Sequence, residues 1–326
     1  MFLNSREKPI ELLYYIALSK RKELTNNEKY QLSNLEKGFE GESLYDEIFD
    51  FIGHDNLYII RDLYLHINNS VTQYDSIIVM DNRIVVNEVK NLTGDYRYDN
   101  NSWYKNNRQM ESDPFIQLNR AKNKIVSLGN KSSLDFYTDS KVIFPNDDFN
   151  FTSDNEKMHN QAVMRTQLKN YFRSFRNETI GDNAKNIVQL IKNSITSKPD
   201  TADFINISEL KHGLYCGHCS SFNLLKGKFQ FKCSDCGSIE SYETHLVRAM
   251  FDYKYLFPSH PMTRLSLLQL IDYKINKNTV FCALKKHCCS VKKGNSTYYT
   301  LKYSNFNQQL SVIRSTQRYK DKIIHS

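Results

Sequence analysis

Residues 73–90 read Gln-Tyr-Asp-Ser-Ile-Ile-Val-Met-Asp-Asn-Arg-Ile-Val-Val-Asn-Glu-Val-Lys. Two runs rich in β-branched residues are separated by Asp81-Asn82, which is a turn signal, so the pattern predicts two neighbouring strands. Asp75 begins the first strand, and Glu88 and Lys90 end the second. Side chains two residues apart on a strand share a face, so Glu88 and Lys90 project together, and a hairpin brings Asp75 beside them.

Two carboxylates and an ammonium group on one small patch are costly to place in a core. They suit phosphodiester cleavage, because hard oxygen ligands hold Mg²⁺ or Mn²⁺ and a lysine can orient water or stabilise charge. Charged residues at strand ends are common, however. Taken alone, these three residues favour a simple salt bridge over a metal site.

The surrounding sequence alternates between strand and helix signals. Further strands are expected at residues 57–61, 64–67 and 141–144, with a hairpin near residues 96–104. Asp113-Pro114 predicts the start of a helix with an apolar face. Upstream, residues 1–37 form a helical lead-in that Gly38 and Gly41 break, and a new helix begins with Glu42 in its first turn. Residues 38–150 are therefore predicted to form an α/β domain.

Four blocks in this region carry a resemblance. They are Gly38-x-x-Gly41-Glu42, Gln73-Tyr-Asp75-Ser-Ile-Ile-Val, Val85-Val-Asn-Glu88-Val-Lys90-Asn-Leu-Thr-Gly94, and Asp113-Pro-x-x-Gln117. In order and spacing they resemble the nuclease-related domain NERD, which is grouped with the PD-(D/E)xK restriction-endonuclease-like nucleases. The resemblance implies a mixed sheet flanked by helices. Asn87 stands where that family usually has an apolar residue.

The resemblance also implies roles for individual residues. Asp75 and Glu88 would be ligands of a catalytic Mg²⁺ or Mn²⁺, and Lys90 would be the catalytic lysine. Glu42 would be an accessory acid, and Gln117 a polar residue that closes the site. Trp103, the only tryptophan, is as consistent with core packing as with stacking on a base.

The cysteine spacing predicts a second kind of metal site. Two Cys-x-x-Cys pairs are separated by thirteen residues, and their members are Cys216, Cys219, Cys233 and Cys236. Four thiolates at this spacing form a closed tetrahedral Zn²⁺ site, which is structural because no coordination position stays open. Residues 209–241 are thus predicted to be a zinc ribbon, with His218 on its surface. The other three cysteines, Cys282, Cys288 and Cys289, are expected to be buried free thiols on a helix face.

Residues 151–208 show a helical period and are predicted to be a helical connector. After the ribbon, helices are expected at residues 242–256, 263–271 and 277–287, followed by a hairpin at 290–301 with Gly294-Asn295 at its tip. This order is typical of a winged helix in residues 242–308, with a basic tail at 309–326. A small helical interaction domain would share the same periodicity.

Charge is concentrated at the C-terminal end. Residues 242–326 contain 14 Lys or Arg and four Asp or Glu, a net charge of +10, whereas the rest of the chain has a net charge of −2. Such asymmetry indicates either a nucleic-acid contact or a solvated, lysine-rich surface. If the third C-terminal helix enters a groove, Lys277, Lys285 and Lys286 face the duplex, and Lys292 and Lys293 of the wing contact phosphates.

Composition excludes several classes of protein. Apolar residues make up 40% of the chain, so wholesale disorder is excluded, and no apolar run approaches the roughly 20 residues of a membrane span. Residues 10–18 are interrupted by Glu11 and are expected to form a helix, not a signal peptide. The odd number of cysteines argues against a secreted disulfide framework. We therefore expect a cytoplasmic protein with no membrane partner.

Three functions remain open from the sequence. The first is a Mg²⁺- or Mn²⁺-dependent nuclease that cleaves DNA, with the ribbon and winged helix holding the nucleic acid. The second is a non-catalytic DNA-binding or regulatory protein that uses a nuclease-like scaffold. The third is an interaction protein whose C-terminal region binds a protein partner. The clustered acids beside a lysine favour the first.

Overall fold

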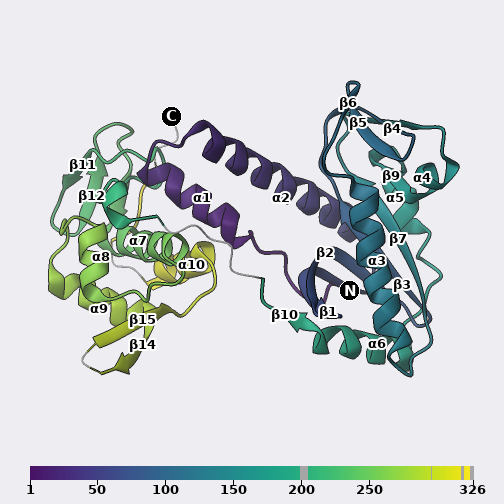
Figure 1. Cartoon of the computed structure of the whole chain (residues 1–326). Coiled ribbons are helices and arrows are strands. Elements are labelled where there is room, and N and C mark those ends of the chain that lie inside the picture. The colour runs from purple at the N-terminus through teal and green to yellow at the C-terminus, as the bar shows by residue number, and fades with distance from the viewer. Residues whose placement is uncertain (199–204, 295, 317–318, 324–326) are drawn as a thin grey trace. The chain divides into compact units, whose positions relative to one another are not determined.

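The computed structural model describes residues 1–198, 205–294, 296–316 and 319–323 (Figure 1). The chain forms two compact units. Unit 1 consists of Met1–Lys8 and Ser33–Thr201, and unit 2 consists of Pro9–Leu32 and Ala202–Ser326. No helix in the described ranges is both long enough and apolar enough to cross a membrane.

Unit 1 is built around a mixed six-stranded sheet in the order β10-β1-β2-β3-β7-β9. Its strands are β1 (Tyr58–Ile67), β2 (Ser70–Val79), β3 (Arg83–Val89), β7 (Tyr137–Phe144), β9 (Ala162–Met164) and β10 (Ile195–Thr196). The pairs β10–β1, β1–β2 and β2–β3 are antiparallel, whereas the pairs β3–β7 and β7–β9 are parallel. This is the mixed α/β sheet that the sequence predicts.

Helices cover both faces of this sheet. They are α2 (Asn26–Ile52), α3 (Pro114–Asn130), α4 (Glu156–Gln161), α5 (Arg165–Arg173) and α6 (Asp182–Asn193). Strand alternation separates two cores. Ile77 and Val86 belong to the core that contains residues of α3 and α6, whereas Ile78 and Val85 belong to the core that contains residues of α2 and α5.

A second, four-stranded sheet in unit 1 has the order β6-β5-β4-β8. Its strands are β4 (Gly94–Asp99), β5 (Ser102–Lys105), β6 (Arg108–Gln109) and β8 (Phe149–Ser153). Trp103 of β5 is 2% exposed and stacks on Tyr96, with Phe144 and Phe115 also near its ring. The tryptophan therefore packs in the core and is not available to stack on a base.

Four sequence predictions about unit 1 are wrong. Asp75 does not begin its strand, because β2 starts at Ser70 and pairs with β1 over its whole length. The α2 helix continues through Gly38 and Gly41, so Glu42 lies well inside the helix and not in its first turn. A Cβ on Gly41 would lie 2.4 Å from the Cβ of Asn91, so this glycine permits a close approach and does not end the helix. The strands expected at 57–61 and 64–67 are one strand, β1. Residues predicted as a helical connector also contribute β9 and β10 to the main sheet.

Unit 2 packs around α7 (Tyr242–Leu256), of which 11 of 15 residues are buried. The other elements are α1 (Ile10–Arg21), the 3-10 helix η1 (Ile207–Glu209), α8 (Arg264–Leu270), α9 (Lys277–His287), α10 (Phe306–Thr316), and the strands β11 (Leu224–Lys226), β12 (Gln230–Cys233), β13 (Ile239–Ser241), β14 (Cys288–Lys293) and β15 (Ser296–Leu301). Arg21 of α1 pairs with Asp252 of α7 at 2.8 Å, and Tyr215 donates to the same carboxylate. This buried pair is satisfied on both sides, as a buried charge requires.

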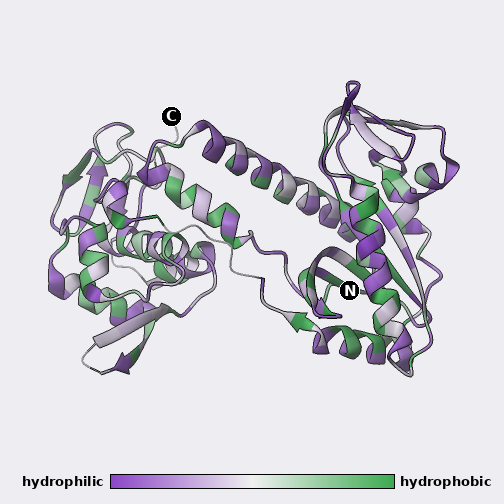
Figure 2. Ribbon diagram, in the orientation of Figure 1, coloured by the Kyte–Doolittle hydropathy of each residue, from purple (hydrophilic) through white to green (hydrophobic). Residues whose placement is uncertain are grey.

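The helix and hairpin order expected for residues 242–301 is present in unit 2. The β14–β15 hairpin is mostly hydrophilic or neutral in Figure 2, and its predicted tip residue Asn295 lies outside the described residues. The prediction for the three additional cysteines is largely wrong. Cys288 is buried, but Cys282 and Cys289 are exposed, and Cys288 and Cys289 belong to β14 and not to a helix.

Candidate active site and metal centre

The structure brings Asp75, in the middle of β2, together with Glu88 and Lys90 at the carboxyl end of β3. The β2–β3 register pairs Ser76 with Asn87, so one further residue places Asp75 opposite Glu88. The Nζ of Lys90 lies 2.8 Å from Glu88 Oε1. Asp75 Oδ2 accepts a hydrogen bond of 2.8 Å from the backbone N–H of Val89. These three residues therefore form the patch that the strand pattern predicts.

A backbone irregularity lies next to Asp75, on the neighbouring strand β1. Asp62 on β1 has a φ of +44°, and the register pairs Arg61 with Ser76 and Leu63 with Tyr74, so Asp62 and Asp75 are opposite one another. Tyr74 and Ile77 belong to the same core although they are three residues apart. Strand alternation is therefore interrupted between Tyr74 and Ile77, although the β1–β2 register is the same on both sides and neither strand has an extra residue.

Lys90 is held by the neighbouring parallel strand. Its backbone N–H donates to the carbonyl of Ile143 on β7 at 2.8 Å, which continues the β3–β7 pairing beyond the end of β3. The carboxyl ends of β3 and β7 therefore lie side by side at the site. In open sheets with parallel strands, ligands bind at this edge.

Glu42 reaches the same group of charges from α2. Its carboxylate forms an ion pair with Arg6, and its side chain is 17% exposed. The Asp75 carboxylate helps to raise the pKa of Glu42, and the Glu42 carboxylate helps to raise the pKa of Lys90. The close contact between Gly41 and Asn91 brings this part of α2 against the segment that follows Lys90.

Burial and mutual repulsion alter the titration of these groups. Burial and the nearby Asp75 carboxylate raise the pKa of Glu88 to about 7, and the same two causes raise the pKa of Glu42 to about 8. Burial also raises the pKa of Asp75. Burial disfavours the Lys90 ammonium, but the carboxylates of Glu88 and Asp75 outweigh this and raise the pKa of Lys90. The site thus combines acids that resist ionisation with a lysine that stays charged.

The donor set fits a divalent cation of the Mg²⁺ type. Mg²⁺ is usually held by one or two carboxylates and completes its shell with water and phosphate oxygens. Asp75 and Glu88 supply two such carboxylates, and a cation would offset the repulsion that raises their pKa values. The ligand atoms of three acidic residues do not all lie within 4.8 Å of one another at this site. Among the described residues, only the four cysteines bring three or more possible ligand atoms that close together.

No sequence motif marks three charged neighbours of this site, which are Arg6, Asp46 and Asp62. Arg6 pairs with both Glu42 and Asp46, and its Nη2 donates to the backbone carbonyl of Asp75 at 3.3 Å. Asp62 adds a further negative charge that raises the pKa of Asp75 and of Glu42. No local pattern marks Arg6, and the positive φ of Asp62 cannot be read from residue type.

A buried polar network lies behind the site, on the opposite side of β3. Asn87 donates to the hydroxyl of Tyr45 at 2.7 Å and accepts from the hydroxyl of Tyr171 at 2.8 Å. Tyr45 also lies 3.3 Å from the hydroxyl of Ser76, the residue that pairs with Asn87 across the strands. These bonds satisfy a fully buried amide next to Glu88 and link β2 and β3 to α2 and α5.

Gln117 is the one predicted catalytic residue with neither a hydrogen bond nor an electrostatic interaction with the others. It lies near the start of α3, whose first turn is capped by the Asp113 side chain through the N–H groups of Phe115 and Ile116. Its side chain is exposed and makes no hydrogen bond with Glu42, Asp75, Glu88 or Lys90. Its role as a residue that closes the site remains a prediction.

The four predicted zinc ligands converge in unit 2. Cys216 Sγ lies 3.6 Å from Cys236 Sγ, and Cys219 Sγ lies 3.5 Å from Cys233 Sγ. All four sulfur atoms lie within 4.8 Å of one another. Tetrahedral zinc with Zn–S bonds of about 2.3 Å places its sulfurs about 3.8 Å apart, so the cluster has the size of a zinc site.

The ribbon around this cluster has the expected turn geometry. Its sheet has the order β11-β12-β13, and Ser220 and Gly237, which directly follow the second cysteine of each pair, have positive φ values of +61° and +74°. The first turn is held on α7 by Glu240, which accepts from the N–H of Gly217 at 2.8 Å and pairs with Arg248. A Cβ on Gly217 would overlap the guanidinium of Arg248 and the carboxylate of Glu240, so any other residue here would displace this ion pair.

The predicted nucleic-acid-contacting lysines lie on the surface of α9 and β14. All five are exposed: Lys277, Lys285, Lys286, Lys292 and Lys293. Lys286 is partly engaged, because its Nζ lies 2.6 Å from Glu243 Oε1. The β14–β15 pairing carries Lys292 and Lys293 opposite Thr297 and Ser296, near the tip of the hairpin.

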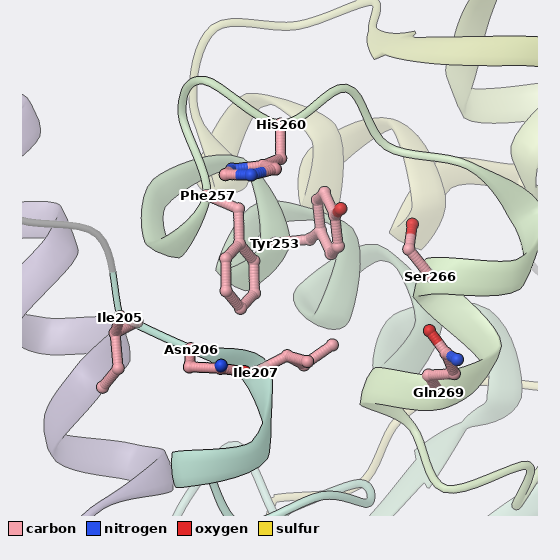
Figure 3. A pocket seen from close by; sticks show the side chains of 8 residues that line it. All are labelled: Ile205, Asn206, Ile207, Tyr253, Phe257, His260, Ser266 and Gln269. Carbon is pink, nitrogen blue, oxygen red and sulfur yellow. The ribbon is translucent and has the colours of Figure 1, made fainter.

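Unit 2 also contains a cavity of about 440 Å³ (Figure 3). Aromatic side chains of Tyr253 and Phe257 lie on one side of it, and His260 lies beside them. None of the predicted catalytic, zinc-binding or nucleic-acid-contacting residues lines it. It is therefore separate from the sites described above.

Comparison with known protein families identifies part of unit 1. Residues 37–145 match the family model NERD, the nuclease-related domain. No curated protein and no solved structure matches the chain. The matched segment contains Glu42, Asp75, Glu88, Lys90 and Gln117, but not Arg6, the zinc ligands or the C-terminal lysines.

Proposed function

We propose that the nuclease-related domain of this chain is a Mg²⁺- or Mn²⁺-dependent nuclease that hydrolyses phosphodiester bonds in DNA. The observation that carries this proposal is the convergence of Asp75, Glu88 and Lys90, with Glu42 nearby, at one edge of the sheet. A scaffold has no need for two buried carboxylates and a third, half-buried one whose mutual repulsion raises pKa values beside a charged lysine. Such a cluster is costly for stability and is kept where it performs chemistry.

In this proposal Asp75 and Glu88 hold the cation. The cation would act as a Lewis acid toward the attacking water and would place positive charge against the phosphate. Asp75 is oriented by the N–H of Val89, and Glu88 is oriented by Lys90, so both carboxylates are restrained before substrate binds. Restraint of this kind lowers the reorganisation needed during the reaction.

Lys90 supplies a positive charge and hydrogen-bond donors in this site and does not act as a base. Its pKa is raised above the ordinary value by Glu88 and Asp75, so its ammonium group remains protonated at neutral pH. Its three N–H groups can bond Glu88 and a phosphate oxygen or the attacking water at the same time. Glu42 supplies a further carboxylate, and Gln117 is available on α3 to contact substrate.

Unit 2 would bind the nucleic acid. The α8 and α9 helices are joined through a turn in which Asp272 and Tyr273 have positive φ, and the β14–β15 hairpin follows α9 directly, which is the element order of a winged helix. The five exposed lysines on α9 and β14 would contact phosphates, which provides affinity without sequence specificity. Zn²⁺ bound by the four cysteines would hold the ribbon against α7.

A DNA-binding or regulatory protein without nuclease activity is the second candidate. One observation favours it: among the described residues, only the cysteine cluster has ligand atoms already gathered at metal-binding density. In this version unit 1 is a scaffold, and the ribbon and the α9 lysines perform the function.

A cleavage assay separates the two candidates. Zinc-loaded protein is incubated with supercoiled, linear and single-stranded DNA and with RNA, in Mg²⁺ or Mn²⁺ and in EDTA. We expect metal-dependent cleavage of DNA that disappears in Glu88→Ala and persists in Glu47→Ala, an exposed acid of α2. Cleavage that survives Glu88→Ala would contradict the assigned site. Salt-sensitive DNA binding without cleavage would favour the regulatory candidate.

A further inference from the structure

The first eight residues form an arm along the edge of β1. Phe2 makes a parallel bridge with Ile59, and the N–H of Leu3 donates to the Ile59 carbonyl at 2.8 Å. Two residues later the Asn4 side chain continues this pairing: its Nδ2 donates to the Arg61 carbonyl at 2.7 Å, and its Oδ1 accepts from the Arg61 N–H at 2.9 Å. The arm is therefore anchored to the strand next to Asp75.

This anchoring delivers Arg6 into the acidic site. Its Nε donates to Asp46 Oδ2 at 2.7 Å and its Nη2 to Asp46 Oδ1 at 3.3 Å. Its Nη1 pairs with Glu42, and its Nη2 also donates to the Asp75 carbonyl at 3.3 Å. The side chain is 5% exposed. One guanidinium thus joins α2 at two positions to the backbone of the proposed metal ligand Asp75.

The charges around the site are arranged in pairs. Lys90 is the partner of Glu88, and Arg6 is the partner of Glu42. Asp46 has a second partner, because Arg61 Nη1 donates to its Oδ2 at 2.9 Å. Loss of Arg6 would therefore leave Asp46 paired but would leave Glu42 without its cation. The planar fork of arginine suits this bridging position, and a lysine could not reach all three groups at once.

We propose that Arg6 is a positioning residue of the active site, which holds the Glu42 carboxylate toward Asp75 so that Glu42 contributes to binding the divalent cation. This inference rests on the proposed nuclease function. Because Arg6 lies outside residues 37–145, the arm completes a site that the matched domain does not contain in full. Arg6 acts through Glu42 and does not itself touch the cation.

Arg61 provides a matched control within the same network. Like Arg6 it is buried, pairs with Asp46, and bonds to the arm through the Asn4 carbonyl. Unlike Arg6 it makes no hydrogen bond with Glu42 or with the Asp75 backbone. Arg6→Gln and Arg61→Gln therefore both weaken the arm, but only the first releases Glu42.

The test measures Mn²⁺ affinity of the zinc-loaded full chain by electron paramagnetic resonance of the free ion, so that it does not depend on activity. We expect Arg6→Gln to weaken Mn²⁺ binding by about tenfold or more, as loss of an outer-shell partner of a metal ligand does. Arg61→Gln should leave the affinity within about threefold while lowering the melting temperature. Arg6→Lys should resemble Arg6→Gln, because it keeps the charge but not the fork.

The sign of the effect distinguishes positioning from simple electrostatics. Removal of a positive charge near a cation site should by itself tighten Mn²⁺ binding. Tighter binding in Arg6→Gln would therefore overturn the proposal and would show that Arg6 competes with the cation. Equal effects of Arg6→Gln and Arg61→Gln would also overturn it, because the arm would then be structural only.

A double-mutant cycle completes the test. If Arg6 acts through Glu42, Glu42→Gln and Arg6→Gln weaken Mn²⁺ binding by similar factors, and the double variant is no weaker than Glu42→Gln alone. Additive effects would contradict this route. If the unmodified protein shows no Mn²⁺ binding that Glu88→Gln removes, the proposed function itself fails, and this is visible before any Arg6 variant is compared.

Discussion

The cysteine cluster and the acidic site are both candidate metal centres, but they are built differently. The four cysteines lie within residues 216–236, and each pair is held by its own tight turn. The acidic site draws on Arg6, Glu42, Asp75 and Glu88 from separate segments of the chain. The four sulfur atoms of the cysteine cluster are already gathered, whereas the acids repel one another and their charge is partly offset by Arg6 and Lys90. A structural metal site fills all coordination positions with protein ligands, whereas a catalytic site leaves a position open for water or substrate.

The largest expected effect is on the cysteine cluster. Cys233→Ser should abolish stoichiometric Zn²⁺ binding, because structural zinc contributes folding free energy on the order of 10 kcal/mol and the site has no spare ligand. Metal analysis of the purified protein measures this directly. Cys282→Ser, on an exposed cysteine, should retain full zinc. Retained zinc in Cys233→Ser would break the contrast between the two centres.

Replacement of a proposed ligand in the acidic site should stabilise the cation-free protein, whereas replacement of a cysteine ligand should remove folding free energy. Glu88→Gln should abolish cleavage yet stabilise the cation-free protein at pH 8. The folded-state pKa of Glu88 is raised to about 7 by burial and by Asp75, so the folded state holds more protons than the unfolded state between pH 4.5 and about 7. Stability of the unmodified protein therefore falls as pH rises through this window, and the amide removes that loss.

Thermal unfolding in EDTA at several pH values checks this prediction. The melting temperature of Glu88→Gln relative to the unmodified protein should rise from pH 5 to pH 8 and then level off. A variant that is equally destabilised at every pH would mean that the Lys90 pair outweighs the burial of Glu88.

An intermediate effect is expected behind the acidic site. Asn87→Val removes the partner of two buried hydroxyls, those of Tyr45 and Tyr171, and should lower the free energy of unfolding by about 1–3 kcal/mol. Denaturant unfolding measures the loss. Adding Tyr171→Phe to Asn87→Val should recover part of it, because one unpaired hydroxyl is then gone. If Asn87→Val is neutral, the network does not hold β2 and β3 together.

The smallest expected effect concerns the wing. Replacement of Lys292 and Lys293 by Gln should weaken DNA binding equally for all sequences and lower the slope of log K against log salt by about 1.8, or about 0.9 for each phosphate contact. Binding titrations at several salt concentrations provide the slope. The matched change at Lys157 and Lys192, exposed lysines of unit 1, should leave the slope unchanged. An unchanged slope in the wing variant would remove the wing from the interface.

Local patterns account for the features that sequence analysis predicted well. The β2–β3 hairpin, the Asp113 cap of α3, the zinc ribbon and the bounds of α7 depend on residue period, turn type or spacing over a few residues. The errors have non-local causes. Gly38 and Gly41 read as helix breakers, but α2 continues because its packing against Asn91 outweighs their low helix propensity. The β9 and β10 strands are too short to show a period and exist only through pairing with β7 and β1.

The sequence alone predicted the four-cysteine cluster and the grouping of Asp75, Glu88 and Lys90, because each set is brought together by one ribbon or one hairpin. Only the tertiary structure decided how Glu42 reaches them, where Asp62 stands, and that Arg6 enters the site. These residues come from segments far apart in the chain, and their meeting depends on the packing of α2 and of the first eight residues against the sheet. Spacing along a chain determines local geometry, whereas contacts between distant segments are selected by burial and charge in the folded state.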